Sequence, residues 1–404
     1  MKNIIQKWTE SSLILKIAGA LVIGAVLGVL CPGAEEIGIP GTLFIGALEA
    51  IAPVLVALLV CSAIAGAGEG IGSRFRTVVI LYLSSTFLSA IVAVFASRLF
   101  PVEIVLGKAE AYGNAGPAGL SEIFTDLLGN LVQNPVKAVG DGNYLGILFW
   151  AIIFGLALKL IHVPGTVEVI TDLANAVSMI VSWVIQFAPI GVMGIMFTTV
   201  STNGIEVFAD YGRLILLLVG TMLFVALVSN PAVVALLLKK NPYPLVFRCL
   251  KESGVPAFFT RSSAANIPVN MKLCEELGLD KDFYSVSIPL GSTVNMNGAA
   301  VTITVMSMVA AHTLGIRIPL PLAIVLSIVS TLGAAGTSGV AGGSLLLIPM
   351  ACSLMGISND VAMEVVAVGF IIGVVQDSVE TALNSSSDVV FTATAEMFEK
   401  RKKK

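Results

Sequence analysis

Residues Pro289 to Val301 read PLGSTVNMNGAAV and interrupt an apolar segment that runs from Phe283 to Ala311. This segment is long enough to cross a bilayer, since about 20 apolar residues suffice. Its centre is nevertheless polar, with Gly291, Ser292, Thr293, Asn295, Asn297 and Gly298. In hydrocarbon, an unwound turn is tolerated only where it lines a protein cavity or a water-filled path. The stretch predicts either an oxygen-rich cation site or a kinked helix whose Asn side chains bind a neighbouring helix.

The composition is typical of a polytopic membrane protein. Of 404 residues, 56% are hydrophobic and 12% are charged, and the mean hydropathy is +0.95, whereas soluble domains carry about 25% charged residues. The formal net charge of −3 gives no reason to expect nucleic acid as a partner. The five cysteines have no metal-ligand spacing and are interpreted as free thiols. His162 and His312 are too far apart to indicate a zinc site.

Six apolar segments before Lys239 are long enough to span a membrane. They are Leu13 to Leu30, Leu43 to Ala65, Thr77 to Phe100, Leu145 to Ile161, Val177 to Thr199 and Leu214 to Leu238. The first is interpreted as a retained span rather than a secretory signal, because no small-residue cleavage site follows it. Basic residues alternate from loop to loop, so the positive-inside rule places the N-terminus, Lys239 and the basic C-terminus in the cytoplasm.

Two later segments are too interrupted to cross the membrane. Residues 245–271 contain Pro256, Arg261 and Pro268, and residues 319–355 contain a glycine-rich run from Gly333 to Gly343. Each leaves two apolar arms that are shorter than a span. Because an even number of crossings must separate Lys239 from the C-terminus, we expect two re-entrant hairpins, the first hairpin (245–271) and the second hairpin (319–355). The prediction is an all-α integral membrane protein with about eight spans, two hairpins and inverted repeats.

The last expected span, Val361 to Ala395, carries three carboxylates inside an apolar helix. One helical face holds Asp377, Glu380, Thr381, Asn384 and Asp388. An ionisable group at the bilayer centre costs about 2.5 to 3.5 kcal/mol, so such residues usually have a function. This face, opposite the polar turn, predicts a site for a cation and an ammonium group. The alternative, stronger for Asp388 than for Asp377, is that the acids lie among lipid headgroups.

The expected tip of the first hairpin reads Arg261-Ser262-Ser263. It combines a cation, two hydroxyls and a half-helix N-terminus, as carboxylate receptors do. With Asp377 available for an ammonium group, the pattern favours an amino acid as substrate. In a second, compatible interpretation Arg261 neutralises Asp377 or Glu380.

An intramembrane serine hydrolase is an alternative from another class. Gly336-Thr337-Ser338-Gly339 matches the GxSG motif of such proteases, and the stretch that begins Ala311-His312 matches their AHxxG motif. However, those proteases place the serine before the histidine, and no histidine follows Ser338. We therefore expect the protein not to be an enzyme.

The Arg261-Ser262-Ser263 tip, the Asn295-Met296-Asn297-Gly298 turn, the glycine-rich second hairpin and residues 377–388 together resemble the dicarboxylate/amino acid:cation symporters, the glutamate-transporter-like family. The NMNG turn is similar to that family's NMDG, and the whole pattern is most similar to the bacterial sodium:serine/threonine symporters. The resemblance implies a homotrimer in the bacterial inner membrane that works by an elevator motion. Residues 1–76 and 101–212 would form the scaffold and trimer contacts, and residues 77–100 and 213–395 the transport domain. Residues 396–404 would form a basic cytoplasmic tail.

The resemblance also implies roles for individual residues. Asp377 would bind the substrate ammonium group, and Asn384 with Ser263 the α-carboxylate. The rest of the substrate site would comprise Arg261, Ser262, Thr337, Ser338, Gly339 and Thr381. One site for co-transported sodium would use the Asp388 carboxylate and the carbonyls of Gly291, Asn295 and Asn384. A second would use Thr293, Met296 and the second hairpin's carbonyls from Thr331 to Ala334, and the residues that match a third are Tyr82, Ser85 and Thr86.

Three departures from the family pattern bear on substrate and ion. Where members with acidic substrates have an arginine this chain has Glu380, and where they have a threonine it has Ala299. A glutamate repels an acidic side chain and accepts a hydrogen bond from a hydroxyl, which favours serine and threonine. Asn297 replaces an acidic residue at the third sodium site, so we expect fewer coupled sodium ions. The open alternatives are sodium- or proton-coupled transport of other small amino acids or dicarboxylates, and an amino-acid-gated anion channel.

Overall fold

Helices form all the regular structure in the part of the chain that the computed structural model describes, which is residues 13–66, 72–106, 132–161, 164–335, 337 and 342–402. Within these ranges, six helical stretches are long and apolar enough to cross a membrane by length and composition. The chain is therefore a multi-pass, all-helical membrane protein.

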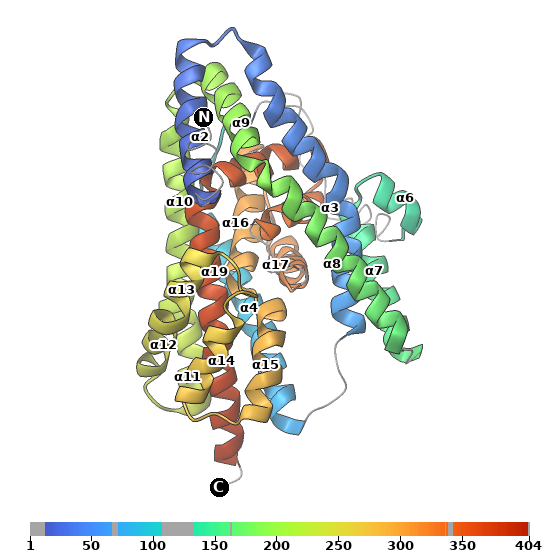
Figure 1. The fold of residues 1–404 in the computed structure, drawn as a ribbon, viewed down its shortest axis with the longest axis vertical. Helices are drawn as coiled ribbons and strands as arrows, with labels where there is room; N and C mark the ends of the chain where they lie inside the picture. Colours follow the sequence, from blue (N-terminus) through green and yellow to red (C-terminus); the bar gives the residue numbers. More distant parts are fainter. Residues whose placement is uncertain are drawn as a thin grey trace, which may run out of the picture.

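One group of helices comes from the N-terminal half of the chain. It comprises α2 (Leu13–Leu30), η1 (Glu35–Gly38), α3 (Ile39–Ala65), α6 (Pro135–Gly140), α7 (Tyr144–Ile161), α8 (Pro164–Gln186) and α9 (Ala188–Asn203). α2 packs along α9, and α3 packs on α7, α8 and α9. Figure 1 shows α3, α7 and α8 extending together to one side of the molecule. Glycines allow the close approach of α2 to α9, since a Cβ on Gly24 would collide with the Met193 carbonyl.

The expected span from Val177 to Thr199 was wrong in its bounds. α8 ends at Gln186 and α9 begins at Ala188, with Phe187 between them. Pro189 occupies the first turn of α9. Proline lacks an N–H and its ring clashes with the preceding turn, so it starts a new helix here instead of continuing the old one. The apolar run conceals this break because proline and its neighbours are apolar.

A second group of helices surrounds the longest helix, α19 (Asn359–Lys402). Its members are α4 (Gly72–Leu99), α10 (Val207–Phe224), the π-helical turn η3 (Val225–Ser229), α11 (Asn230–Leu238), α15 (Lys281–Val294) and α16 (Asn297–Thr313). α16 is buried along most of its length and packs on both α4 and α19. In Figure 1 α19 runs down the centre of this group to the C-terminus.

The two segments expected to form re-entrant hairpins contain short, broken helices, as their interrupted sequences predict. The first hairpin is made of α12 (Tyr243–Cys249), the π-helical turn η4 (Leu250–Gly254), α13 (Val255–Thr260) and α14 (Ile267–Glu276). The second hairpin contains α17 (Leu320–Ala334), η5 (Gly343–Leu347) and α18 (Ile348–Ser353). α13 and η4 pack on α19, whereas α17 packs on α4 and α16.

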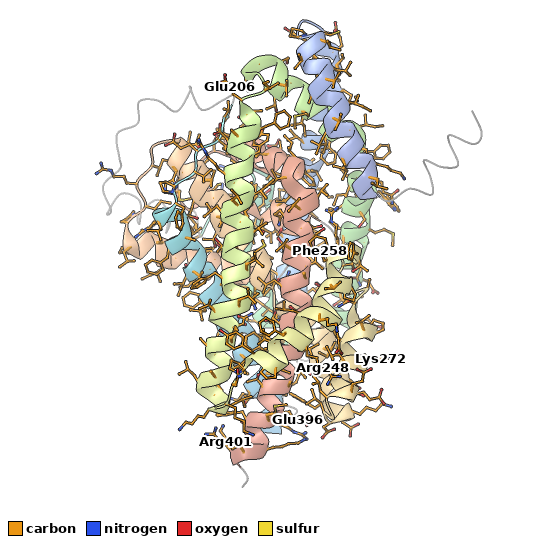
Figure 2. All side chains as sticks on the ribbon, turned by 90° about the vertical axis from the view of Figure 1, so that its left-hand side faces the viewer. Glu206, Arg248, Phe258, Lys272, Glu396 and Arg401 are labelled. Atoms are coloured by element: carbon orange, nitrogen blue, oxygen red, sulfur yellow. The ribbon has the colours of Figure 1, made fainter. Side chains whose placement is uncertain are left out.

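The expected basic tail is helical as far as Lys402, because α19 continues without a break. Arg401 donates hydrogen bonds to the carbonyls of Leu237 and Leu238, which end α11 and lack helical partners. Glu396 is fully buried and accepts hydrogen bonds from the Asp280 backbone N–H. Figure 2 shows Glu396 and Arg401 at one end of the molecule and Glu206 at the other. Residues 396–402 thus continue α19, with Glu396 and Glu399 buried and the basic residues of the last turn exposed.

Candidate functional site

The polar stretch inside the α15–α16 segment is an unwound turn. Two residues separate the helices, and both have non-helical backbone angles: Asn295 has φ −91° and ψ 74°, and Met296 has φ −110° and ψ 57°. Asn295 and Asn297 are completely buried and Met296 is 3% exposed. The irregular backbone is thus enclosed by protein, as a membrane requires. Buried turns of this kind form the binding sites of many transporters.

Asp388 on α19 lies beside this turn and is completely buried. Its Oδ1 accepts a hydrogen bond from Asn295 Nδ2 at 2.8 Å, and the Tyr82 hydroxyl donates to its backbone carbonyl at 3.3 Å. Gly291 is close enough that an added Cβ would lie 2.8 Å from Oδ1. Oδ2 has no hydrogen-bond partner among the described residues. A buried carboxylate oxygen without a partner is costly, so the arrangement fits a small cation.

The turn also meets α4, where residues of the expected third sodium site lie. Ser85 Oγ donates to Asn295 Oδ1, and Thr86 Oγ1 donates to Asn297 Oδ1, both at 3.2 Å. The amide of Asn297 donates to Ser387 Oγ at 3.2 Å. The structure therefore brings the predicted residues together, and the groups that hydrogen bond to Asn297 are neutral hydroxyls.

The residues expected at the second sodium site are not joined by hydrogen bonds in the described part of the chain. The Thr293 side chain is exposed and donates to a carbonyl of its own helix. Thr331 is buried and donates to the carbonyl one turn earlier in α17. The Ala334 carbonyl already accepts hydrogen bonds from the N–H and the hydroxyl of Thr337, at 2.9 and 2.7 Å. The second sodium site stays a prediction.

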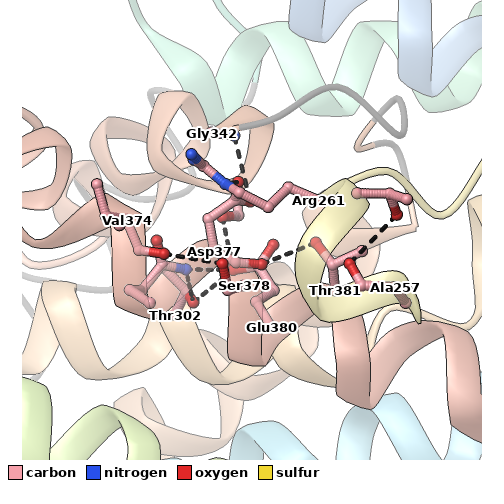
Figure 3. A network of polar contacts seen from close by, with 12 residues as sticks. Ala257, Arg261, Thr302, Gly342, Val374, Asp377, Ser378, Glu380 and Thr381 are labelled. Carbon is pink, nitrogen blue, oxygen red and sulfur yellow. Dashed lines mark hydrogen bonds and ion pairs between the residues drawn. The ribbon is translucent and has the colours of Figure 1, made fainter. Parts of the chain in front are cut away.

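Asp377 joins the tips of both hairpins to α19. Arg261 Nε donates to Asp377 Oδ2 at 2.6 Å, and the two side chains are 10% and 4% exposed. The backbone N–H of Gly342, at the end of the second hairpin's tip, lies 3.3 Å from Asp377 Oδ1. Figure 3 shows Arg261 and Gly342 meeting at this carboxylate. The pairing agrees with the interpretation in which Arg261 neutralises Asp377.

The backbone at the first hairpin's tip is unusual. Arg261 has φ 52° and is one of two non-glycine residues with positive φ in the described chain. This left-handed conformation ends α13 and costs about 1 to 2 kcal/mol for a residue with a Cβ. Such strain is often found at functional sites. Ser263 is buried beside it, while the Ser262 hydroxyl accepts a hydrogen bond from the N–H of Ala265.

Asn384 and Thr381, both expected to contact substrate, are engaged within the protein. Asn384 Oδ1 accepts a hydrogen bond from the N–H of Gly298 at 2.7 Å, which ties α19 to the unwound turn. Thr381 Oγ1 donates to the Asp377 carbonyl at 2.8 Å. Ala299 is completely buried at the start of α16. These residues lie where the turn meets α19, next to both carboxylates of the predicted substrate site.

Glu380 is held by three side chains that our sequence reasoning missed. Its Oε2 accepts hydrogen bonds from Thr302 Oγ1 at 2.6 Å, Ser344 Oγ at 2.8 Å and Gln376 Nε2 at 2.5 Å. Gln376 also donates to Thr302 Oγ1 at 2.7 Å. The spacing of four residues between Gln376 and Glu380 was a usable signal, since it places both on one helical face. Thr302 and Ser344 lie on other elements and have no such signal.

Part of the second hairpin's tip, including Ser338 and Gly339, lies outside the described residues. Thr337 is buried. His312, which the hydrolase alternative requires, lies at the end of α16, and its Nδ1 is buried without a partner in the described chain.

Comparison with known proteins identifies the family. A model of the sodium:dicarboxylate symporter family matches residues 13–398. The serine/threonine transporter SstT of Bifidobacterium adolescentis is 60% identical over 396 residues, which cover 98% of this chain and 92% of the relative. The serine/threonine transporters SstT of Streptococcus thermophilus and Streptococcus agalactiae are each 55% identical, with 98% of both chains covered. These findings confirm the resemblance. Because the family is a symporter family and the relatives are named transporters, the hydrolase alternative is rejected. The chain belongs to the sodium:dicarboxylate symporter family.

Proposed function

We propose that the protein is a sodium-coupled symporter that imports serine and threonine across the bacterial inner membrane. The observation that carries this proposal is the set of three buried carboxylates on α19, Asp377, Glu380 and Asp388, gathered around the unwound turn. The relatives named as serine/threonine transporters support the substrate class. Binding, gating and ion coupling suffice for this function, and no covalent chemistry is needed.

The Arg261–Asp377 ion pair is suited to receive a zwitterion. A bound amino acid would place its ammonium group on Asp377 and its α-carboxylate on Arg261, with Ser263 and Asn384 nearby. Each protein charge would exchange one partner for another, so neither would be left buried without compensation. This unites the two interpretations of Arg261: it neutralises Asp377 in the empty site and receives the carboxylate when substrate is bound.

Glu380 would select the side chain of the substrate. It is 6% exposed, and no described cation forms an ion pair with it. An aspartate or glutamate substrate would bring a second negative charge beside it, whereas serine or threonine would donate a hydroxyl hydrogen bond. Ala299 adds no polar group at its own position. A neutral hydroxy amino acid is therefore favoured over a dicarboxylate.

Sodium would bind first at Asp388, where one carboxylate oxygen lacks a partner. The proposed ligands also include carbonyls of Gly291, Asn295 and Asn384, and the Asn384 carbonyl already accepts a hydrogen bond from Ser387 Oγ at 2.8 Å. At the third site Asn297 offers no charge to offset a buried cation. Fewer sodium ions would accompany each substrate than in members with an acidic residue there, and a measured ratio of three sodium ions to one serine would contradict this.

The motion is proposed to be an elevator movement in a homotrimer. α2, α3, α7, α8 and α9 pack mainly on one another, while α4, α10, α15, α16 and α18 pack on α19, and α17 packs on α4 and α16. This division agrees with a scaffold and a transport domain, and Figure 1 lets the reader follow both groups. Both termini are proposed to be cytoplasmic, and Figure 2 shows Arg401, near the C-terminus, at one end of the molecule.

The test is uptake of labelled serine into proteoliposomes with and without an inward sodium gradient. We expect accumulation only with the gradient, inhibition by unlabelled threonine and none by aspartate. Asp388→Asn should abolish the sodium-driven uptake, while Asp282→Asn, a change of an exposed residue outside the site, should leave this uptake intact. Uptake of aspartate equal to that of serine would overturn the substrate assignment.

A further inference from the structure

The two oxygens of the Glu380 carboxylate have different surroundings. All three donors reach Oε2, namely Thr302, Ser344 and Gln376. Within the described chain none reaches Oε1. Three donors at one oxygen stabilise the ionised carboxylate and fix its orientation. Oε1 is left as the acceptor that can take a further hydrogen bond.

The donors come from three separate elements, and each is fully enclosed. Thr302 of α16 is 0% exposed, Gln376 of α19 is 1% exposed, and Ser344 of η5 is 1% exposed. The hydrogen bond from Gln376 to Thr302 joins two of the donors to each other. In addition, a Cβ on Gly298 would lie 3.0 Å from Glu380 Cγ, so the unwound turn packs against the stem of the same side chain. The Glu380 side chain is thus constrained along its length.

We propose that Thr302, Gln376 and Ser344 are positioning residues that determine specificity: they hold Glu380 by Oε2 so that Oε1 receives the side-chain hydroxyl of the substrate. This inference rests on the proposed function. A serine or threonine substrate completes the hydrogen bonding of the carboxylate. Alanine fills nearly the same volume but leaves Oε1 without a donor, and sites built to bind a hydroxyl reject the analogue that lacks it.

Ser344 gives the arrangement a second consequence, because it belongs to the second hairpin. Glu380 Oε2 has all three of its donors only while η5 lies against α19. In the same arrangement, the N–H of the neighbouring Gly342 lies at Asp377. Recognition of the hydroxyl and closure of the second hairpin therefore share one carboxylate. A hydroxyl-bearing substrate favours the closed hairpin more than alanine does.

Two substitutions test the proposal with little change of shape, Thr302→Val and Ser344→Ala. Each removes one donor to Oε2. We expect each to lower the ratio of kcat/KM for serine to kcat/KM for alanine by about tenfold in proteoliposome uptake, roughly the value of one hydrogen bond. Thr302→Ser keeps the hydroxyl and should keep the ratio. This rescue separates positioning from general packing.

Matched controls lie in the same helix and the same hairpin. Thr304 is on α16, is completely buried, and its Oγ1 has no partner among the described residues, so Thr304→Val should keep the ratio. Ser327 is on α17 and donates only within its own helix, so Ser327→Ala should keep it too. Where uptake is too slow to measure, the increases in Tm that serine and alanine produce in the purified protein give the corresponding ratio of binding affinities.

The proposal is overturned if Thr302→Val and Ser344→Ala reduce serine and alanine transport equally, since that result indicates a structural role only. It is also overturned if the control substitutions change the ratio as much. Failure of the proposed function looks different, because the unsubstituted protein would then show no sodium-dependent uptake of serine.

Discussion

The two hairpins are attached to α19 in different ways. In the first hairpin, Ser253, Asn266 and Asn270 form a hydrogen-bond network with Ser385 of α19, and all four are at most 1% exposed. Asn270 Nδ2 donates to the carbonyl and hydroxyl oxygens of Ser385 at 3.1 and 3.0 Å, and Asn266 Nδ2 donates to the same hydroxyl at 2.8 Å. These groups are neutral and none belongs to the proposed substrate site.

The second hairpin reaches α19 through hydrogen bonds that end on carboxylates. In its described part these are Gly342 to Asp377 and Ser344 to Glu380. The neighbouring residues Leu346, Ile348 and Met350 are apolar and completely buried. Apolar packing is non-directional, so these side chains do not require one specific partner on α19. The second hairpin thus depends on the groups that the substrate would bind, while the network of the first does not. This contrast supports the inference that closure of the second hairpin is coupled to substrate binding.

The strongest test removes the Arg261–Asp377 ion pair, which links the first hairpin to the proposed substrate site. Arg261→Gln should leave Asp377 buried without a cation and lower stability by about 3 to 5 kcal/mol, measured by thermal unfolding without serine. A second substitution, Asp377→Asn, should restore most of that loss because it removes the uncompensated charge. Arg248→Gln is the control, since its ion pairs in the same hairpin are more than a third exposed. Additive losses in the double variant would contradict the interpretation.

The neutral network of the first hairpin is the next target. Asn270→Leu should remove the acceptor of the Ser253 hydroxyl and the side-chain donor to the Ser385 carbonyl, and cost about 2 to 3 kcal/mol. Because the network is remote from substrate, we expect a lower Tm together with an unchanged ratio of serine to alanine transport. Ser344→Ala in the second hairpin should instead lower the ratio of serine to alanine transport and leave Tm nearly unchanged. If Asn270→Leu changes the ratio, the two hairpins differ less than their contacts indicate.

A smaller effect is expected from Gly342→Ala at the second hairpin's tip. Gly342 has φ 75°, and a Cβ there would lie 3.2 Å from the Phe370 ring. The strain is about 1 to 2 kcal/mol and would weaken the contact of the Gly342 N–H with Asp377. KM for serine should rise several-fold with little change in Tm. Gly278→Ala is the matched control, because Gly278 has φ 72°, open space around it and a place at the base of the first hairpin. It should change Tm and not KM.

The smallest effect is expected at the base of the first hairpin, where Arg74 pairs with Asp280 at 2.7 Å. The hydrogen bond from Arg74 lowers the pKa of the Asp280 carboxyl below its ordinary value of about 3.9. A lowered pKa in the folded state gives stability that is present above the unfolded pKa and is lost as pH falls through the folded one. The small Tm difference between the protein and Arg74→Gln should be constant from about pH 5 to 8 and disappear only in stronger acid. A difference that changes near neutral pH would contradict this.

Several features were predictable from the sequence because the bilayer imposes local rules. A polar turn within an apolar segment must be enclosed by protein, and the Asn295–Met296 turn is. Arms too short to span must turn back, and both hairpins contain such arms. In contrast, the break between α8 and α9 was missed, since Pro189 lies within an apolar run and a hydropathy pattern does not register it.

The sequence by itself determined the membrane class, the unwound turn at Asn295, the two hairpins and the face of α19 that carries the carboxylates. Each follows from the cost of exposing polar groups to lipid, and this cost can be assessed within one segment. Only the tertiary structure decided which groups meet those carboxylates: Arg261 at Asp377, and Thr302 and Ser344 at Glu380. These partners are 116, 78 and 36 residues away along the chain, so their contacts depend on how separate helices pack. No local pattern encodes such contacts, because a buried donor can satisfy any acceptor that the packing brings within hydrogen-bond distance.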